Sequence, residues 1–181
     1  VINEPFNGTA DASEWTLSAT SGDEKISGET GSDDVTSAVV KPGKWTLAES
    51  VTDPANDLAK DGYDWTSLVC VDAEGEEIEG VSKNDPDVRV DAGDDITCTF
   101  TNTAKPGSVT WQKTDENGTA LSGSEWTLTG PEGVDYTEFI AEGPAGTFTV
   151  QTELPWGTYV LTEVKAPAGY LILTDPIEFY I

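Results

Sequence analysis

The sequence predicts an all-β protein made of two tandem β-sandwich domains, and three observations carry that prediction. Nearly every apolar segment is short, rich in β-branched or aromatic residues, and bounded by Gly, Pro, Asn or Asp. No segment has a convincing 3.6-residue amphipathic period, although 54–61 could form a single helical turn. Four sequence blocks also occur twice in the same order. Together these features favour sandwiches of about seven strands per domain.

The repeated blocks define the two domains. They are NGTADASEWTLSA from Asn7 and NGTALSGSEWTLTG from Asn117, GKWTLAE from Gly43 and GTYVLTE from Gly157, the Gly-Tyr pairs at Gly62 and Gly169, and ITCTFTN from Ile96 with IEFYI from Ile177. The halves meet at a short hydrophilic linker, 103–107, whose Pro and Gly interrupt any strand. We therefore expect one domain at 1–104 and a second at 105–181.

The expected strands follow the apolar alternation along each half. In the first domain they cover 14–19, 35–40, 44–50, 63–71, 87–90 and 95–102, with a weak strand at 25–27. In the second domain they cover 108–114, 125–129, 136–140, 147–152, 158–165, 171–173 and 177–181. Each is short enough to belong to a compact sandwich.

Composition excludes several classes of function. The chain has 34 acidic and 9 basic residues, no His and a formal net charge of -25, so it repels nucleic-acid phosphates and anionic membrane surfaces. Six Trp, five Tyr and five Phe are too many large apolar groups for a disordered acidic tail. No apolar run reaches the roughly 18–20 residues of a membrane span. Neither end resembles a signal peptide or sorting signal, so we expect a mature or excised segment.

The two cysteines, Cys70 and Cys98, lie in apolar or β-branched alternations, and no second pair exists to make a zinc site. The chain has no Met and a single Arg, and it is rich in Thr, Ser, Gly and Asp, which indicates an extracellular protein. A disulfide is the expected state of two cysteines there. Closing a loop of nearly thirty residues would contribute roughly 3 to 4 kcal/mol.

Four polar residues are expected to point into the two cores. Strand side chains alternate between faces, so Glu163 shares a face with Tyr159 and Leu161, and Glu49 shares one with Trp45 and Leu47. By the same parity Lys113 follows Val109 and Trp111, and Asn102 ends the row Ile96, Cys98, Phe100. Any one of them alone is most simply a strand end that leaves the core. Together they predict buried polar clusters, since an inward carboxylate is costly unless it is protonated or paired.

The second half, 105–181, resembles a Cna-B or SpaA-type prealbumin-like domain of Gram-positive surface proteins and pilins, through GSVTWQKTD from Gly107 and YVLTEVKAPAGY from Tyr159. The first half is similar to SpaA-like prealbumin modules of actinobacterial surface proteins, through ASEWTLSAT, VTSAVVKPGKWTLAES, GYDWTSLVC and DDITCTFTN. This resemblance implies stalk modules of a wall-attached adhesin or pilin. Their partners would be neighbouring domains of the same surface protein and, through a tip domain, host matrix or glycan.

The resemblance also implies an intramolecular isopeptide bond between a first-strand lysine and a last-strand asparagine, assisted by a glutamate. Carried over, Lys113 and Glu163 match in the second domain, and Glu49 and Asn102 match in the first. The asparagine of the second domain is expected two positions past Ile181. The first-domain lysine is expected at or just before Val1, because the repeat places Asn3 opposite Lys113. We thus expect both ends to be cut inside a strand and no complete triad within 1–181.

Other readings are weaker. An adhesive module that binds host glycan or matrix protein directly would need exposed aromatic residues, for which Trp156 is the candidate. In a split pair, the missing strand would come from another molecule.

The Asn-Gly pairs at Asn7 and Asn117 indicate turns in preference to glycosylation sites. Acidic clusters at 85–87, 91–95 and 115–117 are expected to be solvated turns, with no metal site. No cofactor and no enzyme motif is evident, so any catalysis would be one self-modification.

Overall fold

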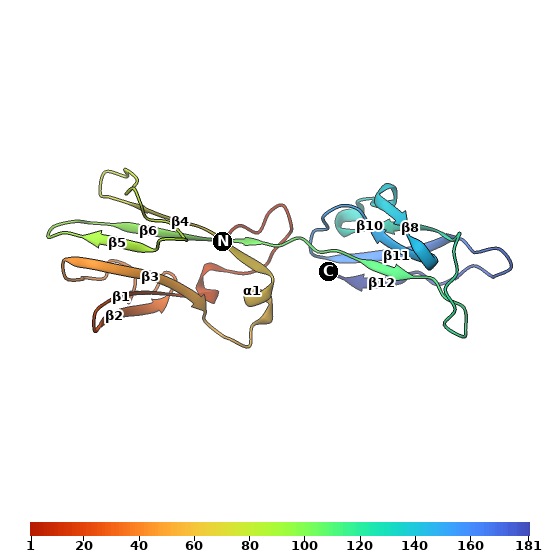
Figure 1. Cartoon of the computed structure of the whole chain (residues 1–181), viewed down its shortest axis with the longest axis horizontal. Coiled ribbons are helices and arrows are strands. Elements are labelled where there is room, and N and C mark those ends of the chain that lie inside the picture. Colours follow the sequence, from red (N-terminus) through yellow and green to blue (C-terminus); the bar gives the residue numbers. More distant parts are fainter. The chain divides into compact units, whose positions relative to one another are not determined.

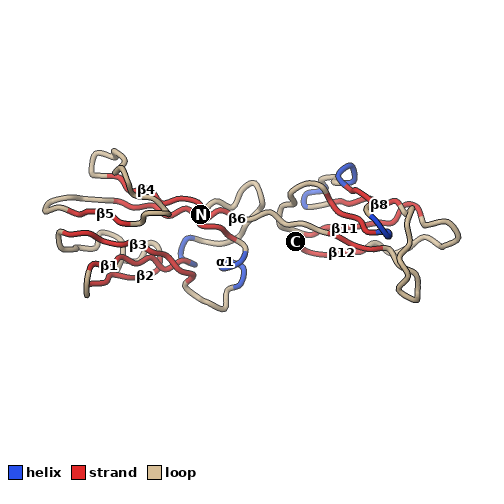
Figure 2. The backbone as a smooth tube through the Cα atoms, viewed as in Figure 1, coloured by secondary structure: helices blue, strands red, loops and turns tan.

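The computed structural model describes all 181 residues, which form two compact units (Figure 1). Unit 1 comprises Val1–Glu4 and Gly8–Lys105, and unit 2 comprises Pro5–Asn7 and Pro106–Ile181. Each unit contains six strands and only short helical turns, so the predicted all-β class is confirmed (Figure 2). The single α-helix, α1 (Asp57–Asp61), is the expected turn near 54–61, and no helix is long and apolar enough to cross a membrane.

Unit 1 is a sandwich of two antiparallel sheets. One has the order β2-β1-β3-β5, formed by β1 (Trp15–Ser21), β2 (Glu24–Glu29), β3 (Gly43–Val51) and β5 (Asp87–Val90). The other pairs β4 (Tyr63–Val71) with β6 (Thr97–Ala104), and Ile2 joins β6 in a parallel bridge at Thr103. The core between them contains Trp45, Leu47, Leu68, Cys70 and Val88, which come from both sheets as strand alternation predicts.

Unit 2 is likewise built from two antiparallel sheets, each of three strands. One has the order β7-β10-β9, with β7 (Thr110–Gln112), β9 (Ile140–Glu142) and β10 (Thr147–Val150). The other has the order β12-β11-β8, with β8 (Glu125–Thr129), β11 (Thr158–Lys165) and β12 (Ile177–Tyr180). Its core contains Trp126, Leu128, Phe148, Tyr159 and Leu161. Leu128 and Tyr159 are fully buried, which confirms the inward face predicted for β11.

The two repeated glutamate strands, β3 and β11, occupy equivalent places. Each pairs on one side with the strand that carries the EWTL block, β1 or β8, and on the other with β5 or β12. Gly43 and Gly157, which start the repeat, have φ values of 156° and 145°, a backbone region that favours glycine. The repetition seen in the sequence is therefore a repetition of backbone geometry.

Two predicted strands are absent, and a third is displaced: most of 136–140 is the 3₁₀ turn Thr137–Phe139, and the strand there is β9 (Ile140–Glu142). Residues 35–40 form turns, and Val39 is 98% exposed, because the loop that connects β2 to β3 passes outside the sheet and meets no neighbouring strand. Residues 171–173 also have extended-looking sequence but no partner strand, so they remain in the loop between β11 and β12 (Figure 2). Alternation marks a segment that could be a strand, and only a neighbouring edge makes it one.

Candidate isopeptide sites

The polar cluster of unit 2 joins its two sheets. Glu163, on β11, is completely buried, and Lys113, just after β7, has a side chain that is 16% exposed. The distance from Lys113 Nζ to Glu163 Oε2 is 3.1 Å. Strand parity directs both side chains inward from opposite sheets, which is why they meet in the interior.

The surroundings of Glu163 leave one of its oxygens without a partner. Oε2 also accepts a hydrogen bond from the backbone N–H of Leu173, at 2.7 Å. Oε1 is buried and makes no hydrogen bond. Lys113 Nζ lies 5.8 Å from the centre of the Trp126 ring, a favourable position for a cation. Because buried polar atoms are almost always satisfied in folded proteins, the unpaired Oε1 marks a position for a further donor.

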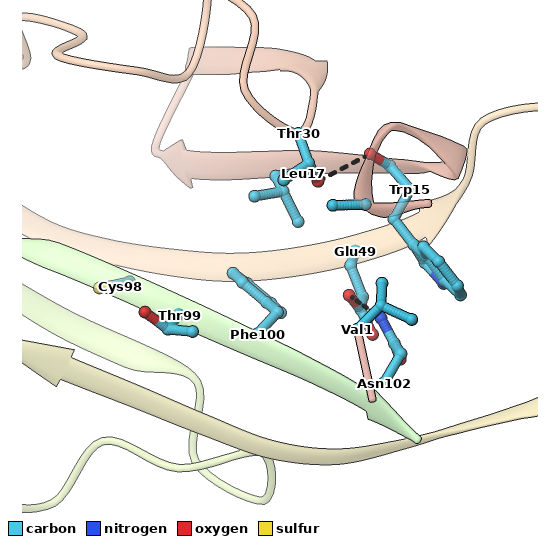
Figure 3. Close-up of a pocket in the computed structure, with 10 residues that line it drawn as sticks. Val1, Trp15, Leu17, Thr30, Glu49, Cys98, Thr99, Phe100 and Asn102 are labelled. Atoms are coloured by element: carbon cyan, nitrogen blue, oxygen red, sulfur yellow. Dashed lines mark hydrogen bonds between the residues drawn. The ribbon is translucent and has the colours of Figure 1, made fainter. Parts of the chain in front are cut away.

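The cluster of unit 1 has a different pair of residues. Asn102 on β6 is 5% exposed, and its Nδ2 donates a hydrogen bond of 3.0 Å to Glu49 Oε2 on β3 (Figure 3). Burial raises the pKa of Glu49 above its usual range, and the hydrogen bond from Asn102 opposes that shift in part. A carboxyl that is more readily protonated is better suited to donate a proton as well as to accept one.

A cavity of about 190 Å³ opens beside this pair. It is lined by Val1, Trp15, Phe100, Glu49 and Asn102 among others, and Figure 3 shows Val1 next to the Glu49–Asn102 hydrogen bond. Val1 is held there because the next residue, Ile2, pairs in parallel with β6. The cavity thus combines apolar walls with a carboxyl and a carboxamide, a setting suited to a long amine side chain.

The structure also shows where other expected residues lie. Asn3, which the repeat places opposite Lys113, does not reach Glu49; its Oδ1 accepts a hydrogen bond of 2.5 Å from the Tyr63 hydroxyl. The first-strand position that faces Glu49 is Val1. A lysine at or just before Val1 therefore remains the prediction for the third member in unit 1.

The register of β12 does not favour the position predicted for the missing asparagine of unit 2. β12 runs antiparallel to β11, with Thr158 opposite Tyr180 and Leu161 opposite Ile177. In this register a residue two positions past Ile181 would face residue 155, which is about 26 Å from Glu163 at 3.3 Å per residue. Alternation identified the inward face of β12, but it could not show that the strand runs away from Glu163.

Comparison with known sequences identifies the fold family. The profile of a prealbumin-like fold domain of the SpaA type matches residues 107–181, and a second SpaA-type prealbumin-like profile matches residues 1–100. This chain belongs to the SpaA-type prealbumin-like domains. The resemblance predicted from YVLTEVKAPAGY and from the strands that carry the cysteines is therefore confirmed, and it fits the SpaA-type domains of Gram-positive pilins. No curated protein matches the chain.

Solved structures that are similar to this chain include three proteins. The Bacillus anthracis TIE protein is 16% identical with a TM-score of 0.41, over 77% of this chain and 34% of its own. A streptococcal ancillary pilin is 25% identical with a TM-score of 0.36, over 78% and 39%. The C-terminal fragment of the pilus adhesin SpaC from Lactobacillus rhamnosus GG is 19% identical with a TM-score of 0.39, over 96% and 76%. The chain spans less than two fifths of the first two, and at these TM-scores the likeness carries no argument about function.

The first SpaA-type unit contains the predicted disulfide. Cys70 on β4 and Cys98 on β6 lie directly opposite each other, with a Cα–Cα distance of 4.0 Å and a separation of 28 residues. Cys70 is completely buried in the core. The bond closes a loop that contains β5, and it joins the strand of Asn102 to its neighbour four residues before that asparagine.

The remaining candidates in the SpaA-type units do not form sites. Trp156, proposed as an exposed binding residue, is 8% exposed, so it offers no aromatic surface. No group of three or more His, Cys, Asp or Glu side chains is arranged to hold a metal ion. Asp115 instead accepts backbone hydrogen bonds from Asn117 and Thr119, and these bonds hold the pKa of Asp115 below its usual range. The acidic segment at Asp115 is thus a turn fixed by its own carboxylate.

Proposed function

We propose that the chain is a structural stalk segment of a pilin or adhesin on the wall of a Gram-positive bacterium. Two SpaA-type sandwiches in tandem, a cross-strand disulfide and strongly acidic composition support a passive extracellular spacer. The observation that carries the proposal is the buried Lys113–Glu163 pair, since an ion pair in a core seldom stabilises a fold more than apolar residues of similar volume and therefore favours a chemical role.

That role is covalent cross-linking of the first and last strands. In unit 2, Lys113 Nζ attacks the side-chain carboxamide carbon of an asparagine. The new C–N bond forms, the original C–N bond to the amide nitrogen breaks, and this nitrogen leaves as ammonia. Glu163 takes a proton from the amine and delivers one to the leaving nitrogen. The fold supplies the proximity, which replaces an external catalyst.

In unit 1, Asn102 is the acceptor, Glu49 assists, and the amine comes from a lysine at or just before Val1. The hydrogen bond from Asn102 Nδ2 to Glu49 Oε2 supports this role, because the carboxyl that would deliver a proton to the leaving nitrogen already lies beside it. Each reaction happens once per chain, so the protein modifies itself and turns over no substrate. A force that pulls on the two ends of a cross-linked unit would then act on a covalent bond. In a unit without the cross-link, the same force would act on the hydrogen bonds between strands.

Intact-mass measurement under reducing conditions tests this proposal on a polypeptide that extends beyond both ends of these residues. We expect the loss of one ammonia molecule for each cross-linked unit. Glu163→Ala should abolish the loss from unit 2, and Glu49→Ala should abolish the loss from unit 1, without affecting the other unit. An unmodified mass in the folded, extended protein would contradict the cross-linking. The 181-residue chain itself should show no loss of ammonia.

A further inference from the structure

The repeated Asn-Gly pair is a part of the duplication that the proposed cross-links do not use. It occurs at Asn7–Gly8 and at Asn117–Gly118, and both copies continue with Thr and Ala. The side chain of an asparagine that precedes glycine is open to attack by the next backbone nitrogen, because glycine has no Cβ to obstruct the approach. The two copies have the same local sequence but different surroundings, so the structure allows their reactivity to be compared.

The second copy lies in an open turn. Asn117 and Gly118 are both exposed, and a Cβ added to Gly118 would meet no atom within 4 Å. The polar contacts of Asn117 are local: its backbone N–H donates to Asp115 Oδ1 at 2.9 Å, and its side chain interacts with the same carboxylate. No distant part of the chain therefore holds this asparagine in place.

The first copy is held by distant residues. Asn7 is also exposed, but its Nδ2 donates a hydrogen bond of 3.3 Å to Trp156 O within unit 2. Gly8 is closely packed, because a Cβ added to it would lie 2.3 Å from the Tyr63 hydroxyl oxygen and 2.8 Å from Ala104 Cβ. Contacts far away in the sequence therefore restrict both residues of this pair.

Attack on the side chain requires the backbone of the pair to rotate, so that the carboxamide carbon can approach the glycine nitrogen. In both copies this nitrogen first has to leave a hydrogen bond. Gly118 N–H donates to Asp115 O at 3.0 Å, and Gly8 N–H donates to Asn3 O at 3.0 Å. Because this obstacle is the same in the two copies, the remaining contacts decide the difference. Local opening costs less free energy in an exposed turn than in a packed segment.

We propose that Asn117 is a site of spontaneous deamidation and that the fold protects Asn7 from the same reaction. The backbone nitrogen of Gly118 loses its proton to solvent and attacks the carboxamide carbon of Asn117. The new N–C bond forms, the bond to the amide nitrogen breaks, and this nitrogen takes up a proton and leaves as ammonia. Water then adds to one of the two carbonyl carbons of the cyclic imide. The ring opens to aspartate or isoaspartate, and the backbone nitrogen regains a proton.

The modified turn belongs to the hairpin that follows Lys113. Leu121 N–H donates to Lys113 O at 2.9 Å, and Asp115 Oδ1 accepts a hydrogen bond of 2.8 Å from Thr119 N–H inside the turn. Isoaspartate adds a methylene group to the main chain at position 117, which changes the loop length that sets the hairpin register. Both products also place a new negative charge near Asp115. The modification therefore loosens the hydrogen bond between Leu121 and Lys113.

The test is incubation of the folded 181-residue protein in mildly alkaline buffer, followed by peptide mapping with mass spectrometry. We expect deamidation of Asn117 to be at least about tenfold faster than that of Asn7. In denaturant the two rates should become similar, because the local sequences are the same. The matched control is Asn117→Gln, which keeps a carboxamide but needs a larger ring and should stay unmodified. Gly118→Ala is a poorer control, because Gly118 has a φ of 80° and alanine would strain the turn.

The outcomes are distinct from those of the proposed cross-links. Faster deamidation of Asn117 in the folded protein, with similar rates in denaturant, supports the proposal. No deamidation of Asn117, or a rate at Asn7 that is equal or higher, overturns it. Amide exchange of Leu121 is then compared between fresh and deamidated protein: faster exchange supports loosening of the hairpin, and unchanged exchange contradicts it. Deamidation raises the intact mass whereas a cross-link lowers it, so neither result depends on the other.

Discussion

Units 1 and 2 present their inward-facing glutamates, the half-buried Glu49 and the buried Glu163, from equivalent strands, β3 and β11, yet different groups reach the two carboxyls. Glu49 is bound by a carboxamide from β6 and has a cavity where an amine would fit. Glu163 is bound by an amine from Lys113 and keeps one oxygen unpaired. Each unit therefore shows two of the three groups of the proposed cross-link, and the pair that is present differs. Between them, the two units contain all three groups of one site: the amine of Lys113, a glutamate carboxyl and the carboxamide of Asn102.

Removal of the Lys113 amine should give the largest effect on this comparison. Lys113→Met leaves a buried carboxylate unpaired, so unit 2 should lose about 3–5 kcal/mol of unfolding free energy while unit 1 is unchanged. Denaturant unfolding followed by unit-resolved hydrogen exchange measures both. Lys44→Met, which breaks the exposed pair with Asp87 in unit 1, is the matched control and should cost about 0–1 kcal/mol. If Lys113→Met and Lys44→Met lowered the unfolding free energy equally, the prediction that Lys113 pairs with a buried carboxylate would be contradicted.

The disulfide should give the next largest effect, confined to unit 1. Cys70→Ala combined with Cys98→Ala removes a 28-residue cross-link and should lower the stability of unit 1 by about 3–4 kcal/mol. Reduction of the disulfide in the unsubstituted protein should have a similar effect, and the midpoint of the unfolding transition of unit 2 should not change. A shift of the unit 2 transition on reduction would show that the units are not independent in stability.

Loss of the Asn102 carboxamide should have a smaller effect. Asn102→Leu leaves Glu49 without its hydrogen-bond donor in a half-buried position, which should cost unit 1 about 1.5–3 kcal/mol. The double variant with Glu49→Leu removes both polar groups and should recover much of that loss. Thermal or urea unfolding of the single and double variants measures the coupling energy between Asn102 and Glu49. If the losses of unfolding free energy in the two single variants add up to that of the double variant, the two side chains do not interact.

The pH dependence of unit 1 should show the smallest effect. Because the pKa of Glu49 is raised in the folded state, the folded protein binds the proton more tightly than the unfolded chain. The contribution of Glu49 to stability is then present at low pH and is lost as pH rises through its unfolded and then its folded pKa. Glu49→Gln, which keeps an oxygen for Asn102, should flatten this part of the profile, which begins at the ordinary glutamate pKa of about 4.3 and extends to higher pH. An unchanged slope would contradict the raised pKa.

The site residues could be predicted because strand alternation is a local property. Glu163 follows Tyr159 and Leu161 at intervals of two, and all three are buried. The same parity placed Asn102 in the interior of unit 1. The alternation of residues 35–40 gave a wrong strand, since nothing in that segment reports whether another strand lies beside it.

The sequence by itself determined the all-β class, the duplication, the disulfide partners and the faces that point inward, because these depend on periodicity and on the count of cysteines. Only the tertiary structure decided which strands pair and in which direction they run. It showed that β12 runs antiparallel to β11 and away from Glu163, and that β6 pairs with β4 in a sheet separate from that of β3. Backbone hydrogen bonds are the same for every residue type, so pairing leaves little trace in a single sequence.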